Sequence, residues 1–260
     1  MAADQRFEFE TGAATDVGRK RQINEDSYLA RPGYGLWVVA DGMGGHSAGD
    51  YASQTIVAEL DSVGMATSVE DLRARFMERL TRANDLILQH ADRLGAGTIG
   101  ATVVAILANG DHYACVWSGD SRAYLLRGGQ FVQQSRDHTE VQALLDAGTI
   151  TPHEAETWPR KNVITRAVGV TPTPQCDVVV GALAPGDVFI LCSDGLTEHM
   201  LDHEIAAAAA HFGPQEACDR LVQETLVRGA RDNVTVIAVR CVEADVSSDD
   251  DMLIDGAEEY

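Results

Sequence analysis

Short apolar runs separated by turn residues constrain the fold of this 260-residue chain more than any other feature. The runs are rich in β-branched and aromatic residues and are too short for helices, so they predict β-strands. They span Leu36–Ala40, Ala101–Leu107, His112–Trp117, Ala123–Leu126, Val188–Cys192 and Val234–Val239. Asn109-Gly110 lies between the second and third runs, and Gly128-Gly129 follows the fourth. Both dipeptides are typical of hairpin turns, so the sequence predicts antiparallel pairing.

Four longer segments predict helices, and on two of them apolar residues recur three and four positions apart. The segments are Ala48–Val63, Val69–Arg93, His203–His211 and Pro214–Arg228. The strands cluster around these helices and do not alternate with them, which favours an α+β fold with antiparallel sheets over a doubly wound parallel sheet. The length of the chain, with 45% hydrophobic residues, predicts one domain over residues 1–242.

Charge and hydropathy exclude several classes of protein. The formal net charge of −20 argues against binding to nucleic acid or to an anionic membrane, because both call for clustered Lys and Arg. No apolar stretch is long enough to span a membrane, and the N-terminus lacks the basic start and apolar core of a signal peptide. We therefore expect a cytoplasmic protein, and we take it to be a monomer.

Residues 243–260 form an acidic C-terminal tail. They include eight acidic residues and no Lys or Arg. This composition predicts a solvated, disordered end. The spacing of the carboxylates does not match an EF-hand loop, so we do not expect calcium binding there.

Carboxylates stand at the ends of the predicted strands. They are Asp41, Asp120 and Asp194 after strands, Asp232-Asn233 before Val234–Val239, and Glu25-Asp26 before the stretch SYLA. Any one of them alone is typical of a turn or a cap. Together, with small residues around several of them as in ADGMGG and CSDGL, they indicate strand ends that converge on one rim.

A cluster of carboxylates favours bound divalent cations, because the negative charges otherwise repel one another. Ligands that are all oxygen select hard ions, so we expect Mg²⁺ or Mn²⁺, with Ca²⁺ as an alternative, and not Zn²⁺. Two such ions about 3.5–4 Å apart can bridge a water molecule, lower its pKa and direct it at a phosphorus atom. The pattern predicts phosphoester hydrolysis without a protein nucleophile.

Other hydrolase chemistries lack their motifs in this chain. The five cysteines include no CxxC pair and none followed six positions later by arginine; Cys115, for example, is followed there by Ser121. We therefore expect inert core thiols, and no disulfide framework, zinc knuckle or cysteine phosphatase. The motifs of serine hydrolases, P-loop NTPases and zincins are also absent.

A phosphoryl substrate also requires positive charge near the carboxylates. Arg21 precedes Glu25 by four residues, and a guanidinium can bind phosphate through two hydrogen bonds. Arg19, Lys20 and Arg21 are equally typical of a solvated basic turn. Residues 137–169 mix helix formers, prolines and polar residues, which predicts either a mobile flap beside a site or a plain surface subdomain.

Seven motifs of the chain together resemble one family. In order from Thr15 to Arg240, they are TDVGRKRQINEDSYL, VVADGMGGHSAGDYAS, GATVVAIL, VWSGDSRAYLLR, SRDHT, VFILCSDGLTEHM and RDNVTVIAVR. They are similar to motifs of the metal-dependent protein phosphatases of the PPM or PP2C type, in their bacterial form. The resemblance implies a sandwich of two central antiparallel β-sheets flanked by α-helices on both faces, with a flap at about residues 137–169. It also implies two Mn²⁺ or Mg²⁺ ions and hydrolysis of phosphoserine and phosphothreonine in proteins.

The resemblance also implies roles for individual residues. Asp41 corresponds to the carboxylate that bridges both metals, and Gly42 offers its backbone carbonyl to one of them. Asp194 and Asp232 correspond to the remaining ligands of the other metal.

Further residues correspond to the surroundings of the two metals. Glu25 and Asp26 match the pair that holds metals or their waters. Asp120, together with Asp194, matches a third, weaker metal site. Arg21 matches the phosphate-binding arginine.

The last correspondences concern a supporting residue and the proton donor. Asn233 matches a supporting residue beside the metals. The eukaryotic branch has histidine two residues after the bridging aspartate, where this chain has Met43. His46 follows three residues later, as is usual in bacterial relatives, and is one candidate general acid. The alternatives are a cap of the helix that begins near Ser47, a partner of a metal ligand, or a metal-bound water as the proton donor.

The sequence thus predicts a metal-dependent phosphoprotein phosphatase in which a metal-bridging water attacks phosphoserine or phosphothreonine directly. Its partners would be phosphorylated proteins, namely serine/threonine kinases and their substrates. Two alternatives stay open: a non-catalytic phosphoprotein-binding or scaffold protein on the same fold, and a regulatory phosphatase dedicated to one partner. The presence of every matched metal ligand favours catalysis.

Overall fold

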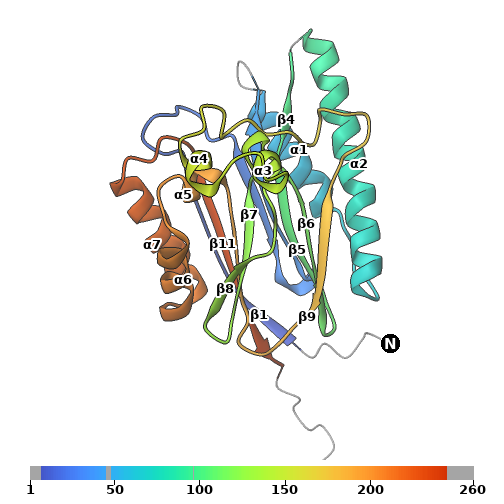
Figure 1. Cartoon of the computed structure of the whole chain (residues 1–260). Helices are drawn as coiled ribbons and strands as arrows, with labels where there is room; N and C mark the ends of the chain where they lie inside the picture. The colour runs from blue at the N-terminus through green and yellow to red at the C-terminus, as the bar shows by residue number, and fades with distance from the viewer. Residues whose placement is uncertain (1–6, 45–47, 96, 245–260) are drawn as a thin grey trace, which may run out of the picture.

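Two antiparallel β-sheets lie face to face, and helices cover the outer face of each (Figure 1). The computed structural model describes residues 7–44, 48–95 and 97–244. The first sheet has the order β1 (Phe7–Asp16), β11 (Val234–Glu243), β10 (Val188–Cys192), β7 (Arg122–Arg127) and β8 (Gln130–Gln133). The second has the order β2 (Asp26–Arg31), β3 (Leu36–Met43), β5 (Val103–Asn109), β6 (His112–Ser118) and β9 (Asp177–Ala182). β4 (Gly100–Ala101) pairs with β3, and the short 3-10 helix η1 (Pro32–Tyr34) lies between β2 and β3.

Alternate residues of the central strands fill different layers of the core. In β3, Trp37 and Val39 pack between the sheets, whereas Val38 packs beneath the helices of the second sheet. In β10, Phe189 packs between the sheets and Ile190 beneath the helices of the first sheet. Since both faces of these strands are buried, their sequences are continuously apolar even though the pairing is antiparallel. The α+β sandwich expected from the sequence is confirmed.

Two helices cover each outer face. α1 (Gly49–Asp61) and α2 (Val69–Leu94) lie on the second sheet, and α6 (Asp202–His211) and α7 (Pro214–Val227) lie on the first. All four predicted helices are present, with ends within two residues of the predicted ones. Local caps fix the longest of them, α2. Ser68 Oγ accepts a hydrogen bond from the Asp71 amide at 3.2 Å, and Gly95 ends the helix with a φ of 56°.

The two predicted hairpins are confirmed. Asn109-Gly110 joins β5 to β6, and Gly128-Gly129 joins β7 to β8, with positive φ at all three glycines. Four observed strands have no counterpart among the six predicted runs: β1, which pairs with β11, β2, β8, and β9, which is an edge strand of the second sheet.

Residues 137–169 contain two short helices and lie at one end of the sandwich. The helices α3 (Glu140–Asp146) and α4 (Pro152–Glu156) sit near α5 (Asp194–Thr197), which follows β10 (Figure 1). Backbone hydrogen bonds close the base of the segment, from the Thr165 amide to the His138 carbonyl and from the Glu140 amide to the Val163 carbonyl. The segment is therefore an excursion from the sheets, as the sequence predicts.

The cysteines, the C-terminus and the helices of the described part can each be compared with the sequence predictions. All five cysteines are free, and all but the half-buried Cys176 are buried, as expected for core thiols. β11 continues through Glu243, so the predicted start of the tail at residue 243 falls inside a strand; residues 245–260 lie outside the described part. No helix in the described part of the chain is both long and apolar enough to cross a bilayer.

Candidate active site

Strand pairing places Asp26 opposite Asp41. Asp26 begins β2 and faces Asp41 of β3 across the antiparallel ladder. The Asp26 side chain is buried, and its Oδ2 accepts hydrogen bonds from Ser193 Oγ at 2.8 Å and from Thr235 Oγ1 at 2.7 Å. Ser193 follows β10 and Thr235 lies in β11, so Asp26 of the second sheet is hydrogen-bonded to the end of the first.

Asp194 and Asp232 reach the same end from the first sheet. Asp194 is the first residue of α5, directly after β10, and Asp232 precedes β11. The negative charges of Asp26, Asp194, Asp120 and Asp232 all act on Asp41, in that order of strength. The structure thus brings the carboxylates from separate strand ends into one cluster, as the sequence predicts.

Burial and mutual repulsion raise the pKa values of these carboxyl groups. Burial is the largest cause in each case, and it raises the pKa of Asp26 and of Asp120 to about 6 and that of Asp194 to about 8. The pKa of Asp41 lies well above its ordinary value, because of burial and then the charge of Asp26. Burial also raises the pKa of Glu25, and the charge of Arg21 opposes this rise. Such a cluster is stabilised by compensating positive charge.

Two buried carboxylate oxygens in the described part of the chain have no hydrogen-bond partner. They are Asp26 Oδ1 and Asp194 Oδ1. Leaving such an atom unsatisfied is costly, and a hard divalent cation is a ligand that would satisfy it. The donor set therefore fits Mg²⁺ or Mn²⁺ in chemistry and charge.

The carboxylate side chains of the cluster are not arranged as metal ligands in this structure. Within residues 7–44, 48–95 and 97–244, no three His, Cys, Asp or Glu side chains are grouped tightly enough to hold a metal ion. Other partners occupy some of the oxygens, because Asp232 Oδ2 accepts a hydrogen bond from Arg21 Nη2 at 2.7 Å and Asp26 Oδ2 accepts two from hydroxyls. The carboxylates lie together, but the assignment of each one as a metal ligand stays a prediction.

Asn233 holds the loop that carries Arg21 and Glu25. Its Nδ2 donates to the carbonyls of Val17 at 2.9 Å and Ile23 at 3.0 Å, and its Oδ1 accepts from the Glu25 amide at 2.8 Å. A single buried amide side chain thus satisfies three backbone groups and fixes this loop against the start of β11. The predicted supporting role of Asn233 has a physical basis in these contacts.

Gly42 leaves room for the protein's own backbone. A side chain at this position would clash with the carbonyl of Gly49 at the start of α1 and would lie 2.7 Å from the carbonyl oxygen of Glu25. The Gly42 amide donates to that same Glu25 carbonyl at 3.1 Å. Glycine is thus required here so that β3, α1 and the Glu25 segment can meet beside Asp41.

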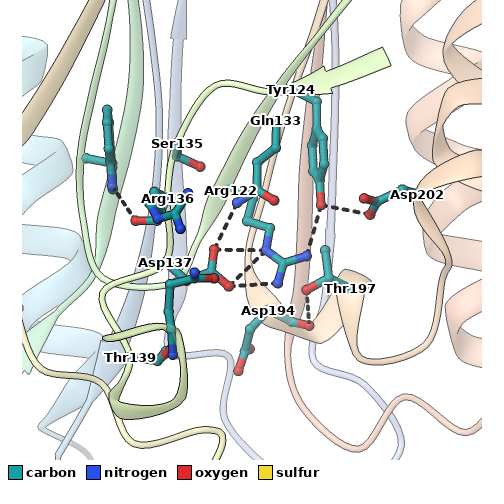
Figure 2. A network of polar contacts seen from close by, with 12 residues as sticks. Arg122, Tyr124, Gln133, Ser135, Arg136, Asp137, Thr139, Asp194, Thr197 and Asp202 are labelled. Atoms are coloured by element: carbon teal, nitrogen blue, oxygen red, sulfur yellow. Dashed lines mark hydrogen bonds and ion pairs between the residues drawn. The ribbon is translucent and has the colours of Figure 1, made fainter. Parts of the chain in front are cut away.

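An ion pair beside Asp194 is not predicted by the sequence. Arg122, at the start of β7, makes three hydrogen bonds of 2.7–3.1 Å to the carboxylate of Asp137, and its Nη1 donates to the Tyr124 hydroxyl at 3.1 Å (Figure 2). The Tyr124 hydroxyl in turn donates to Asp202 at the start of α6, at 3.1 Å. Since Asp137 is the first residue of the excursion, this network fixes where the excursion leaves the sheet. The sequence feature that could have indicated this pair is an arginine at the start of an apolar strand.

Buried side chains anchor both ends of the excursion. His138 is 8% exposed, and its Nδ1 accepts from the Gly119 amide at 3.2 Å, next to Asp120. At the other end, Asn84 of α2 accepts from the Gly169 amide at 2.7 Å. Between them, Asn162 Nδ2 donates to Glu198, directly after α5, at 2.9 Å. The excursion is therefore positioned over the end of the sandwich that carries the carboxylates.

The predicted general acid lies outside the described residues. His46, the candidate general acid, is one of residues 45–47, which the structure does not describe. The helix after it begins at Gly49 and has Ala48 as its N-cap residue. The proton donor therefore stays a prediction.

Comparison with known proteins identifies relatives over nearly the whole chain. A family model described as protein phosphatase 2C matches residues 21–143. Protein phosphatase PhpP of Streptococcus pneumoniae is 38% identical over 249 residues, which cover 91% of this chain and 99% of PhpP. Serine/threonine protein phosphatase PstP of Mycobacterium tuberculosis is 38% identical over 259 residues, or 93% of this chain. These cover 49% of PstP, so the chain spans about half the length of that relative.

A solved structure agrees with the fold. The catalytic domain of PstP in complex with two manganese ions superimposes with a TM-score of 0.82 at 34% identity, covering 91% of this chain and 100% of that domain.

Proposed function

The chain belongs to the protein phosphatase 2C family of bacterial serine/threonine phosphatases, and we propose that it hydrolyses phosphoserine and phosphothreonine in proteins with the help of two divalent cations. The observation that carries this proposal is the carboxylate cluster, with its two unpartnered buried oxygens, beside an exposed arginine. The manganese ions bound to the PstP catalytic domain support Mn²⁺ as the natural choice. A scaffold function without catalysis has no support among the relatives.

The proposed ligand set follows from the position of each carboxylate. The charges of four other aspartates raise the pKa of Asp41, and Asp41 would hold the ions, together with the Gly42 carbonyl. Asp194 and Asp232 would complete one site. When bound, the ions would activate water and neutralise charge on the substrate oxygens.

Three further carboxylates would complete the surroundings. Glu25 and Asp26 would hold an ion or its waters, and the hydroxyls of Ser193 and Thr235 orient Asp26 for that task. Asp120 would contribute, with Asp194, to a third, weaker site, which agrees with the effect of the Asp120 charge on the pKa of Asp194. The single domain over residues 1–242, the cytoplasmic location and the monomeric state are proposed on the sequence alone.

Arg21 is the proposed phosphate-binding residue. Its side chain is 49% exposed and pairs with Asp232 at the rim, so its guanidinium can exchange a carboxylate partner for a phosphate. Arg21→Ala should lower kcat/KM for a phosphothreonine peptide by about tenfold to a hundredfold, mainly through KM, since a hydrogen bond to a charged group contributes about 1.5–3 kcal/mol. Steady-state kinetics check this. Arg21→Lys keeps the charge but loses the planar guanidinium, so its kcat/KM should lie between those of the unmodified protein and Arg21→Ala. An unchanged KM in Arg21→Ala would contradict the phosphate-binding role.

The function itself is tested by phosphate release from synthetic peptides. With Mn²⁺ present, the purified protein should release phosphate from phosphoserine and phosphothreonine peptides and from a small aryl phosphate. The matched unphosphorylated peptides serve as blanks. Failure to hydrolyse any of these substrates across a titration of Mn²⁺ and Mg²⁺ would refute the proposed function and favour a phosphoprotein-binding role.

A further inference from the structure

Unpaired basic side chains gather beside the candidate site of this strongly acidic protein. Most described arginines are engaged in ion pairs; Arg228, for example, pairs with both Glu204 and Glu224. Arg19, Lys20 and Arg231 are exposed, and their side chains make no ion pair or hydrogen bond in the described part of the chain. We call these three residues the basic rim.

The basic rim is built by two segments that are far apart in sequence and joined by backbone contacts. The Arg19 amide donates to the Ala230 carbonyl at 2.8 Å. Gly18, with a φ of 78°, fits closely against the backbone of Asp232, where a side chain would clash. On the other segment, the Arg231 amide donates to His199 Nε2 at 3.1 Å. The positions of these residues are therefore fixed by the backbone, while their charged ends remain free.

The rim lies directly next to the proposed phosphate-binding residue. Arg21 follows Lys20 in the chain, and its guanidinium pairs with Asp232, the neighbour of Arg231. That pair neutralises the Asp232 carboxylate beside the basic rim, and the carboxylate of Asp16 accepts a hydrogen bond from the Gly18 amide at 2.8 Å. Three positive charges beyond Arg21 thus remain without a partner where a bound phosphopeptide would extend from the site.

We propose that the basic rim selects phosphopeptides with acidic residues next to the phosphoserine or phosphothreonine. The proposal rests on the function proposed above and adds the substrate class to it. Exposed charges steer and orient a charged partner but contribute little affinity each, since surface ion pairs are weak and screened by salt. A net charge of −20 repels acidic peptides elsewhere on the protein, which makes an unpaired basic rim beside the site the favoured point of approach.

The test compares two phosphothreonine peptides of equal length, one with flanking glutamates and one with glutamines at the same positions, at saturating Mn²⁺. The protein should prefer the acidic peptide by about threefold to tenfold in kcat/KM at low ionic strength, and the preference should shrink in 0.5 M salt. In the triple variant Arg19→Gln/Lys20→Gln/Arg231→Gln the two peptides should become equivalent. Its turnover of a small aryl phosphate should stay unchanged, because the side chains of Arg19, Lys20 and Arg231 are exposed and form no hydrogen bond or ion pair in the described part of the chain.

Arg73→Gln is the matched control, because Arg73 of α2 makes no ion pair among the described residues and that helix covers the second sheet. It should keep the full preference for the acidic peptide. The proposal is overturned if the unmodified protein turns over both peptides equally, if the triple variant keeps the preference, or if Arg73→Gln loses as much of it. In each of these cases metal-dependent hydrolysis of the aryl phosphate would still uphold the proposed function, whereas loss of all hydrolysis would refute that function itself.

Discussion

Asp41→Asn should lower kcat for a phosphothreonine peptide by about 10²–10³-fold or more, a loss of the size seen when one transition-state contact is removed. Asparagine has the same shape as aspartate but no charge. The substitution therefore weakens the attraction for the two proposed cations at the position on which the other four aspartates converge. Kinetics at several Mn²⁺ concentrations measure the loss, and excess Mn²⁺ should restore only part of the rate. Asp194→Asn should act in the same direction, because one of its oxygens is buried without a partner.

The same substitution should stabilise the metal-free protein. Asp41 is repelled by Asp26, Asp194, Asp120 and Asp232, and removing its charge relieves this repulsion. Thermal unfolding in EDTA should therefore show a higher Tm for Asp41→Asn than for the unmodified protein. Asp219→Asn, on the exposed surface of α7, serves as the control and should change neither rate nor Tm. If Asp41→Asn instead lost activity and Tm together, the carboxylate would be structural and its proposed role wrong.

The sequence predicts those parts of the fold whose pattern is local. The apolar runs, the Asn109-Gly110 turn and the periodic helices each carry their own signal, and the structure confirms them. β1 carries no such signal, because polar residues and Gly12 interrupt it. Its pairing with β11 runs from Phe7 opposite Glu243 to Asp16 opposite Val234, and a side chain at Gly12 would clash with the backbone of α7. Long-range pairing creates this strand, and no local pattern could show it.

The candidate site, like the fold, is predicted by the sequence only in part. Carboxylates at strand ends predict a cluster once the strands are known to share a sheet sandwich, and Asp26 opposite Asp41 shows why this reasoning works. Arg21 could not be distinguished from Arg19 and Lys20 by residue type; the resemblance singled it out, and the structure now shows its pairing with Asp232. The Arg122–Asp137 pair was missed because it joins two segments whose contact depends on the path of the excursion.

Removing divalent cations should abolish phosphopeptide hydrolysis and should destabilise the protein in a pH-dependent way. In the metal-free protein, burial raises the pKa of Asp26 and Asp120 to about 6 and that of Asp194 to about 8, against an ordinary value of 3.8. A carboxyl whose pKa is raised on folding contributes stability that is complete below its unfolded pKa and is lost as the pH rises through its folded pKa. The metal-free protein should therefore lose stability as the pH rises from about 4 to about 8.

Mn²⁺ should reverse this loss, and most strongly at the higher pH. At pH 8 the cation replaces protons that the carboxyls no longer hold, whereas at pH 5.5 it must displace them. The gain at pH 8 should be on the order of a few kcal/mol, since each unit of pKa shift corresponds to about 1.4 kcal/mol and water screens the half-buried Asp120 and Asp194. For a chain of this size, that is a rise in Tm of roughly 5–10 °C.

Thermal unfolding at pH 5.5 and pH 8, each with EDTA and with Mn²⁺, measures the loss of stability without metal and its reversal by Mn²⁺. Phosphate release under the same conditions gives the matching activities. Asp41→Asn is the informative control, because loss of the central charge should shrink both the pH dependence without metal and the gain with Mn²⁺. A Mn²⁺-induced rise in Tm that is as large at pH 5.5 as at pH 8 would mean that the ion binds away from these carboxyls. Full activity retained after dialysis against EDTA would contradict metal-dependent hydrolysis itself. Because the carboxylates repel one another without a cation, the features that should make the site catalytic also make the metal-free fold weakest at the higher pH, where the cations should bind most strongly.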